Sequence, residues 1–153
     1  MDNFLGRIVL SSDFGSGTVA EIQKMGSPEQ EFLVVNHHEG GAKSFIPKEN
    51  TDRYRFMASV EELDQALGDI REQDEAQDFP SKKDRINYFK KESRIQDLNS
   101  IVNLINELRA IDDKGSMEDQ VLAKLVKTIT LEYSLAHEIS IQAARRKINE
   151  ILK

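Results

Sequence analysis

Basic residues are concentrated in one short segment of the 153-residue chain, and phosphate binding is the chemistry that they would serve. Residues 82–94 hold six bases against two acids. Lysine and arginine side chains along one face of a helix can hold successive phosphates at the edge of a DNA groove. The competing interpretation is an ordinary solvated helix face. Asp84 and Glu92 favour it because they reduce the positive charge of this segment. The candidate DNA-binding residues are Lys82, Lys83, Arg85, Lys90, Lys91 and Arg94.

The other chemistry-bearing residues do not form a catalytic or metal-binding set. The chain has no cysteine, which excludes disulfides, thiolate catalysis and cysteine-bound zinc. His37 and His38 are adjacent, and neighbouring side chains in an extended segment point apart, so they are a poor pair of metal ligands. The Gly-Ser-Gly at residues 15–17 precedes an expected strand, whereas a phosphate-binding loop precedes a helix. We expect neither an enzyme nor a bound cofactor.

The overall composition is that of a soluble globular protein. Charged residues make up 31% of the chain and hydrophobic residues 39%, with a net charge of −6. Net acidity argues against generic adhesion to nucleic acid but leaves room for a local basic patch. No apolar run approaches the roughly 20 residues of a membrane span, and the N-terminus does not read as a signal peptide. We therefore expect a cytoplasmic protein that does not bind membranes.

The first third of the chain has the pattern of a small β domain. Residues 7–10, 18–22, 32–35 and 42–46 are rich in β-branched and aromatic residues, and turns containing Gly, Ser, Asp or Pro separate them. Four or five short strands in so few residues cannot make an extended sandwich. A small, strongly bent barrel of the SH3 or Tudor kind closes such strands instead. We predict this β-barrel domain over residues 1–58.

The last of these strands is the candidate docking edge. Pro47 has no N–H group, so it either ends the strand or places it at the edge of the sheet. An edge strand has unpaired backbone groups, to which another protein can add a strand. Phe45 and Ile46 point to opposite faces, so only one of them can belong to the core. In the competing interpretation, Phe45 is the core residue and Lys43 discourages edge pairing.

The remainder of the chain, residues 59–153, has helical periodicity and is predicted to form a compact all-α domain. Ser59 and Glu62 have the spacing of a capping box. The segment near residues 72–80 begins with four acids and no base over residues 72–78, and we interpret it as a linker. About five helices are expected, over residues 59–70, 80–94 with Pro80 as the first residue, 95–111, 116–135 and 140–152 with Ser140 as the cap. The fold class is therefore α+β with two domains.

Several short segments follow one another in an order that resembles a known family. They are residues 6–9, 14–22, 32–35, 45–50, 104–108 and 131–136, with Arg85 and its basic neighbours in between. This series resembles the CarD/CdnL family of bacterial transcription factors over essentially the whole chain. The N-terminal part is also similar to the RNA polymerase-interacting domain of transcription-repair coupling factors.

The resemblance implies two binding functions. The β domain would bind the RNA polymerase β subunit by strand pairing along an edge, and the helical domain would contact promoter DNA at the upstream edge of the bubble. In the family a tryptophan wedges into the minor groove there. This chain has no tryptophan; the wedge position falls near Lys82, and Phe79 is the nearest ring. The implied polymerase-binding residues are Lys24, Met25, Lys43, Ser44, Phe45 and Ile46.

A second function from a different class stays open. The chain could be a protein-interaction adaptor that keeps the docking edge and uses its helices to bind another protein without contacting DNA. We expect a monomer, although an unpaired edge also allows a dimer formed by edge pairing or strand exchange.

Overall fold

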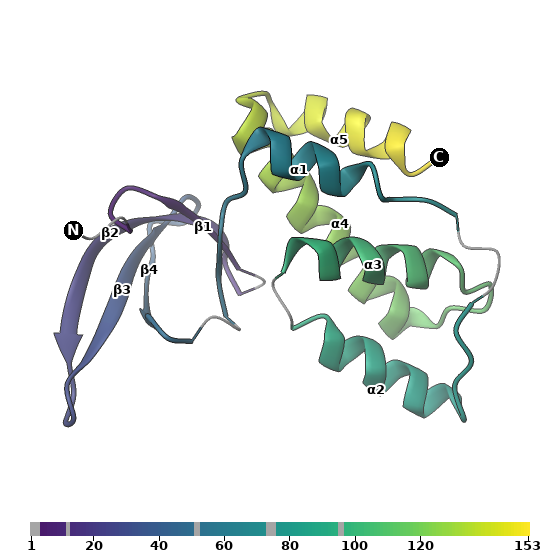
Figure 1. The fold of residues 1–153 in the computed structure, drawn as a ribbon, viewed down its shortest axis with the longest axis horizontal. Helices are drawn as coiled ribbons and strands as arrows, with labels where there is room; N and C mark the ends of the chain where they lie inside the picture. Colours follow the sequence, from purple (N-terminus) through teal and green to yellow (C-terminus); the bar gives the residue numbers. More distant parts are fainter. Residues whose placement is uncertain (1–3, 12, 51–52, 73–75, 95–96) are drawn as a thin grey trace. The chain divides into compact units, whose positions relative to one another are not determined.

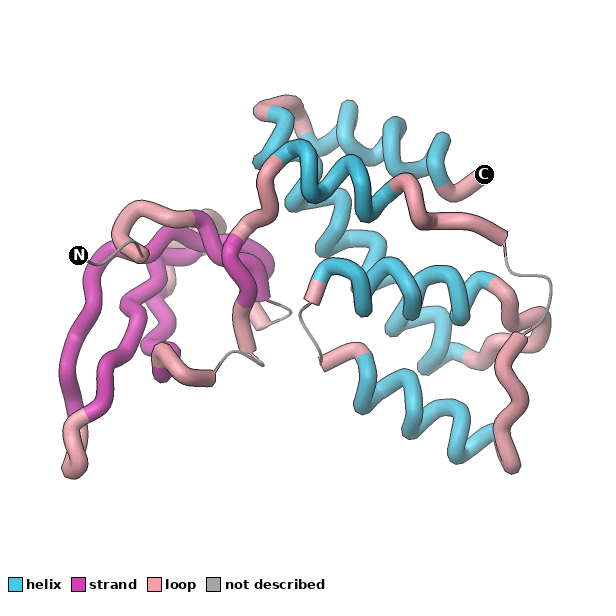
Figure 2. Tube along the Cα trace, in the orientation of Figure 1, coloured by secondary structure: helices cyan, strands magenta, loops and turns pink. Residues whose placement is uncertain are grey.

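The chain folds into an α+β structure, with its strands in the N-terminal third and its helices in the remainder (Figures 1 and 2). It divides into two compact units, Met1–Met57 and Ala58–Lys153, which we call the β unit and the helical unit. Within the described residues, no helix has the length and apolar character needed to cross a bilayer. The computed structural model describes residues 4–11, 13–50, 53–72, 76–94 and 97–153.

The β unit is a five-stranded antiparallel sheet with the strand order β4-β3-β2-β1-β5. The prediction of four or five short strands is confirmed. β4 ends one side of the sheet and the two-residue β5 ends the other. The strands are β1 (Ile8–Ser11), β2 (Gly15–Met25), β3 (Gln30–His37), β4 (Lys43–Pro47) and β5 (Arg55–Phe56).

Alternation along the strands builds the core of the β unit. Leu33 and Val35 of β3 lie on the same face as Ile46 of β4, because Leu33 and Ile46 are direct cross-strand partners. All three are at most 1% exposed. Their cluster also includes Val9, Val19 and Tyr54.

β2 begins earlier than the sequence pattern predicts. The sequence predicts this strand over residues 18–22, and β2 already starts at Gly15. Gly15 has a φ of +83°, a conformation that glycine adopts without steric cost. Ser16 and Gly17 can therefore pair with β1 directly after it.

The helical unit has one hydrophobic core to which every described helix contributes. The helices are α1 (Val60–Leu67), α2 (Lys82–Glu92), α3 (Leu98–Arg109), α4 (Ser116–His137) and α5 (Ile141–Ile151). Each places at least one side chain in the core at no more than 1% exposure. These residues, in helix order, are Leu63, Phe89, Ile105, Ile129 and Ile148.

Two predicted helix caps are confirmed. The Ser59 hydroxyl accepts the Glu62 N–H at 3.2 Å, and the Glu62 carboxylate accepts the Ser59 N–H at 3.3 Å. Together they form the capping box expected before α1. At α5, the Ser140 hydroxyl accepts the Ala143 N–H at 3.1 Å. These contacts join residues three apart, so the local sequence is sufficient to predict them.

The start of α2 differs from the prediction, and the predicted start of α3 lies outside the described residues. α2 begins at Lys82 and not at Pro80, because the Ser81 hydroxyl accepts the Asp84 N–H at 3.1 Å and makes Ser81 the cap. α3 begins at Leu98 after the Asp97 cap. Its predicted start at residues 95–96 lies outside the described residues, as do residues 73–75 of the predicted acidic linker.

Two buried polar side chains fix the chain on either side of α1. The Glu132 carboxylate of α4 accepts the Ala58 N–H at 2.8 Å where the chain enters the helical unit. The Asn106 amide of α3 donates to the Asp69 carbonyl and accepts the Arg71 N–H, both at 2.9 Å. Asn106 thereby satisfies backbone groups beyond the C-terminal end of α1, which holds that segment against α3.

Candidate docking edge and basic helix

β4 is bonded to β3 on one side, and among the described residues no strand pairs with its other edge. The His37 N–H donates to the Ala42 carbonyl at 2.9 Å, and the Lys48 N–H donates to the Glu31 carbonyl at 3.0 Å. In an antiparallel pair, alternate residues exchange these bonds. The register between the two strands therefore turns the backbone groups of residues 44 and 46 toward β3, and those of residues 43, 45 and 47 outward.

An exposed aromatic ring lies on the same strand as these outward backbone groups. Phe45 is 48% exposed, whereas its neighbour Ile46 is 1% exposed and belongs to the core. The expectation that only one of the two is a core residue is confirmed, and the interpretation of Phe45 as that residue is wrong. Lys43 and Phe45 each present an N–H and a carbonyl at the edge, and Pro47 presents only a carbonyl. The last backbone donor along this edge is therefore the Phe45 N–H group.

The other predicted docking residues do not share this edge. Lys24 and Met25 lie at the end of β2, where they pair with β3, so β3 separates them from β4. Ser44 turns its side chain to the core face, where its hydroxyl lies 2.7 Å from His37 Nε2. Strand order decides the position of Lys24 and Met25, which spacing within one strand does not reveal, whereas alternation along β4 decides the direction of Ser44.

The adjacent histidines have structural partners, a feature that the sequence did not reveal. The His37 ring also stacks on Phe14, with 4.4 Å between ring centroids. His38 Nδ1 lies 2.8 Å from the Ser16 hydroxyl, and its Nε2 lies 2.8 Å from the Thr18 hydroxyl. His38 therefore joins the loop after β3 to the start of β2. Among the residues that the structure describes, no group of three or more potential ligands could hold a metal ion.

On α2, three lysines lie on a face away from the core. Lys83, Lys90 and Lys91 are exposed, while Phe89 is 1% exposed and packs in the core. Spacings of seven and eight residues correspond to about two helical turns, which places the three lysines on one side of the helix. Arg94, in the turn that follows α2, is also exposed.

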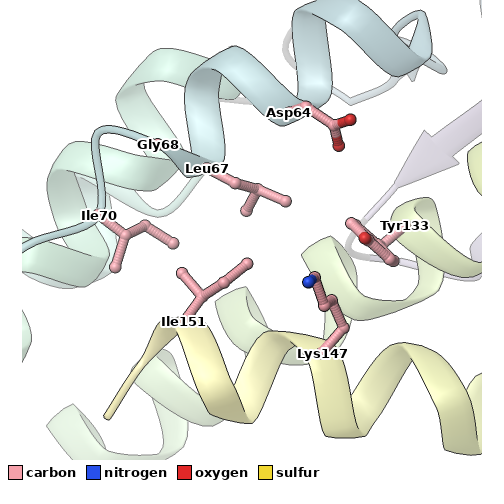
Figure 3. A pocket seen from close by; sticks show the side chains of 7 residues that line it. All are labelled: Asp64, Leu67, Gly68, Ile70, Tyr133, Lys147 and Ile151. Atoms are coloured by element: carbon pink, nitrogen blue, oxygen red, sulfur yellow. The ribbon is translucent and has the colours of Figure 1, made fainter.

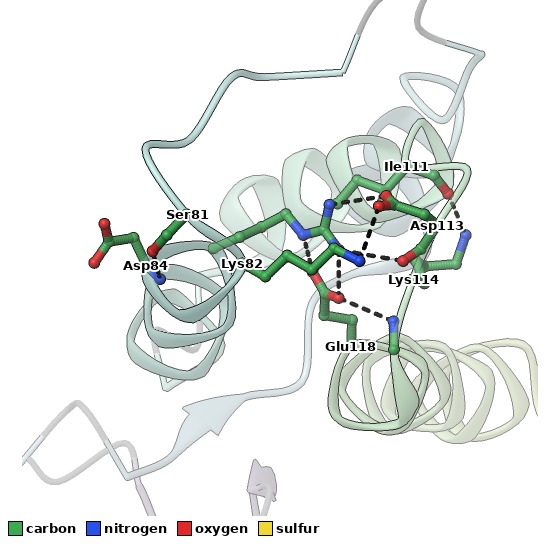
Figure 4. A network of polar contacts seen from close by, with 9 residues as sticks. Ser81, Lys82, Asp84, Ile111, Asp113, Lys114 and Glu118 are labelled. Atoms are coloured by element: carbon green, nitrogen blue, oxygen red, sulfur yellow. Dashed lines mark hydrogen bonds and ion pairs between the residues drawn. The ribbon is translucent and has the colours of Figure 1, made fainter.

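Figure 4 shows a polar network that includes the carboxylates of Asp113 and Glu118. Arg85 bonds to both of them inside the helical unit and does not belong to the surface formed by the three lysines. Its guanidinium donates from Nη2 to Glu118 Oε1 at 2.9 Å and from Nη1 to Asp113 Oδ1 at 2.9 Å. The Arg85 side chain is 12% exposed and the Glu118 side chain 2%. We therefore assign Arg85 a structural role in place of the predicted phosphate contact. Lys82 stays exposed, but its ammonium lies 3.5 Å from Asp113.

The charges of this network stabilise one another. Burial alone would raise the pKa of Glu118, but hydrogen bonds from Arg85 and from the Gly115 N–H outweigh it and leave that pKa lowered. The hydrogen bond from Arg85 also lowers the pKa of Asp113. The hydrogen bond to Glu118 raises the pKa of Arg85 despite partial burial. Arg85 and Glu118 are therefore both ionised, and their ion pair joins the start of α2 to the start of α4.

Phe79 is packed into an aromatic cluster. Its ring centroid lies 5.2 Å from that of Tyr88 and 5.9 Å from that of Phe89. Burial, together with a hydrogen bond to Glu107, raises the pKa of Tyr88 to about 12. Phe79, the ring nearest the expected wedge position, therefore packs against Tyr88 and Phe89 of α2.

The two surfaces are suited to binding: one offers backbone groups around an exposed ring, and the other offers exposed lysines on a helix face. No family model matches the sequence, and no curated protein matches it.

Proposed function

We propose that this protein is a transcription regulator of the CarD/CdnL kind that docks on the β subunit of bacterial RNA polymerase through β4. The observation that carries the proposal is the outer edge of β4, with which no described strand pairs and where Phe45 is exposed. The ordered resemblance along the chain supports the choice of partner. The assignment of the β unit as an SH3- or Tudor-like domain belongs to the same proposal, and its five antiparallel strands are compatible with it.

Docking would proceed by strand addition. A partner strand beside β4 would accept from the N–H groups of Lys43 and Phe45 and donate to the carbonyls of Lys43, Phe45 and Pro47. The missing N–H of Pro47 would limit the pairing to a short strand. Phe45 shares its face of the sheet with its cross-strand partner Val34, so an apolar partner residue would pack there. Lys43 would favour an acidic residue at the other end.

The helical unit would then act on promoter DNA near the upstream edge of the bubble. Lys83, Lys90 and Lys91 would contact phosphates, which fix position without reading sequence. No reaction would be catalysed. The protein would change the lifetime of a polymerase–promoter intermediate in the bacterial cytoplasm, through phosphate contacts and without an aromatic wedge.

Phe45→Glu is expected to weaken polymerase binding about tenfold or more, because it replaces an apolar contact with a charge that must be desolvated at the interface. The measurement is the affinity of the 153-residue chain for the β-subunit lobe of the source organism's RNA polymerase. Leu5→Glu is the matched control, because Leu5 is 55% exposed in the same unit but lies outside β4. Equal affinity of Phe45→Glu and wild type would contradict docking at β4.

Replacing Lys83, Lys90 and Lys91 together by glutamine is expected to lower affinity for forked promoter DNA. The slope of log affinity against log salt should fall by about 2–3, as three phosphate contacts would require. The same triple replacement at Lys24, Lys124 and Lys127, which are also exposed, should leave the slope unchanged. If the wild type binds polymerase but shows no salt-dependent DNA binding, the adaptor function replaces the DNA-binding one.

A further inference from the structure

A hollow of about 530 Å³ lies within the helical unit, between α1, α4 and α5 (Figure 3). Apolar side chains gather at one end: Leu67 and Ile70 from the α1 side, and Ile151 from α5. Polar side chains lie at the other end. The hollow is open to solvent at the polar end, where Asp64 and Lys147 are exposed. Its volume and its combination of apolar walls with a few polar groups lie within the range of small-molecule sites.

The polar end has a carboxylate that a neighbouring side chain orients. Asp64 Oδ1 lies 2.8 Å from His137 Nε2, and the His137 ring stacks on Tyr133 with 4.2 Å between centroids. Tyr133 and Asp64 both line the hollow. Among the contacts of the described residues, the second carboxylate oxygen of Asp64, Oδ2, has no hydrogen-bond partner. It can accept from a ligand's ammonium group.

The opposite charge comes from α5. Lys147 lines the same hollow, and Figure 3 shows its ammonium directed toward the middle of it. Within the described part of the chain, Lys147 makes no ion pair, either with Asp64 or with another carboxylate. An ammonium group and a carboxylate that face one hollow without meeting each other match a ligand that carries both charges.

We infer that this hollow binds a small zwitterion with an apolar body, of the chemical class of the hydrophobic amino acids. The ligand's ammonium would donate to Asp64 and its carboxylate would accept from Lys147. Its apolar body would lie against Leu67, Ile70 and Ile151. The inference does not depend on the proposed polymerase docking, because every lining residue belongs to the helical unit.

The test uses three probes that differ in one charged group: L-phenylalanine, 3-phenylpropanoate without the ammonium, and phenethylamine without the carboxylate. Binding to the 153-residue chain is followed by NMR of the Ile70 and Ile151 methyl groups. We expect phenylalanine to shift both methyl signals and to bind roughly tenfold to a hundredfold more tightly than either analogue. If one analogue binds as tightly as phenylalanine, or if no probe shifts these signals, the inference is overturned.

Variants test whether Lys147 binds the ligand's carboxylate and Asp64 binds its ammonium group. Lys147→Met should weaken phenylalanine binding to the level of phenethylamine, and Asp64→Asn should weaken it to the level of 3-phenylpropanoate. Lys127→Met removes an exposed lysine of α4 that does not line the hollow, and it should have no effect. Spectra of each variant establish that it is folded. A folded Lys147→Met protein that binds phenylalanine like the wild type would contradict the assignment.

Discussion

Gly17→Ala is expected to destabilise the β unit by about 3 kcal/mol. Gly17 is in β2, between its partners Val9 on β1 and His37 on β3. A Cβ atom at this position would lie 2.6 Å from Val35 Cγ1 and 2.7 Å from the Asn36 carbonyl oxygen. The second contact is with backbone, so no change of rotamer relieves it. β2 and β3 would have to separate locally, which breaks the hydrogen bonds between them.

Gly40→Ala is the matched control. Gly40 has a φ of +81°, and a Cβ there would meet nothing within 4 Å. This variant measures the cost of a side chain in the left-handed region alone, about 1 kcal/mol. Unfolding should be followed through amide signals of β2 and β3, so that the helical unit does not mask the transition. Equal stability of the Gly17→Ala and Gly40→Ala proteins would contradict the steric account.

Glu118→Leu is expected to destabilise the helical unit by about 3 kcal/mol, because it leaves the largely buried Arg85 with the exposed Asp113 as its remaining carboxylate partner in the network. It also removes the acceptor for the Gly115 N–H at the start of α4, a bond of 3.0 Å. The double variant Arg85→Met/Glu118→Leu removes both charges. Its loss should be smaller than the sum of the two single losses, and denaturant unfolding of all four proteins measures the difference. Additive losses would mean that the ion pair does not couple the two residues.

The same pair predicts how stability depends on pH. The pKa of Glu118 is lowered in the folded protein, so the folded state keeps this carboxylate ionised at pH values where the unfolded state has bound a proton. The stabilisation is fully present above the ordinary glutamate pKa of about 4.3 and is lost as the pH falls through the lower folded value. The stability difference between wild type and Glu118→Gln should therefore shrink as the pH falls from about 5 toward 3. A constant difference over this range would contradict the assignment.

Local patterns predicted much of the fold, because the interactions involved are short in sequence. The Ser59 capping box and the Ser140 cap each depend on residues three apart. Pro47 lacks a donor and therefore indicated either the end of a strand or an edge strand; the structure places it at the end of β4, the last strand of the sheet. Strand alternation required that only one of Phe45 and Ile46 be buried.

The parts that the sequence did not reveal depend on partners distant in the chain. Arg85 is one of six bases in a short segment, and nothing nearby in sequence distinguishes it from Lys83. Its carboxylate partners are 28 and 33 residues away. Similarly, Lys24 belongs to a strand that pairs with β3 and not with β4, which only strand order decides. The hollow lined by Asp64 and Lys147 depends on the packing of three helices and has no signature in the spacing of residues.

Amide hydrogen exchange at β4 tests the docking proposal most directly. In the free protein, the N–H groups of Lys43 and Phe45 face outward and should exchange rapidly, whereas those of Ser44 and Ile46 face β3 and should be protected. If the β lobe of RNA polymerase adds a strand here, the Lys43 and Phe45 amides should slow by about tenfold or more, while Ser44 and Ile46 change little. A complex in which the Lys43 and Phe45 amides exchange as fast as in the free protein would contradict docking through β4.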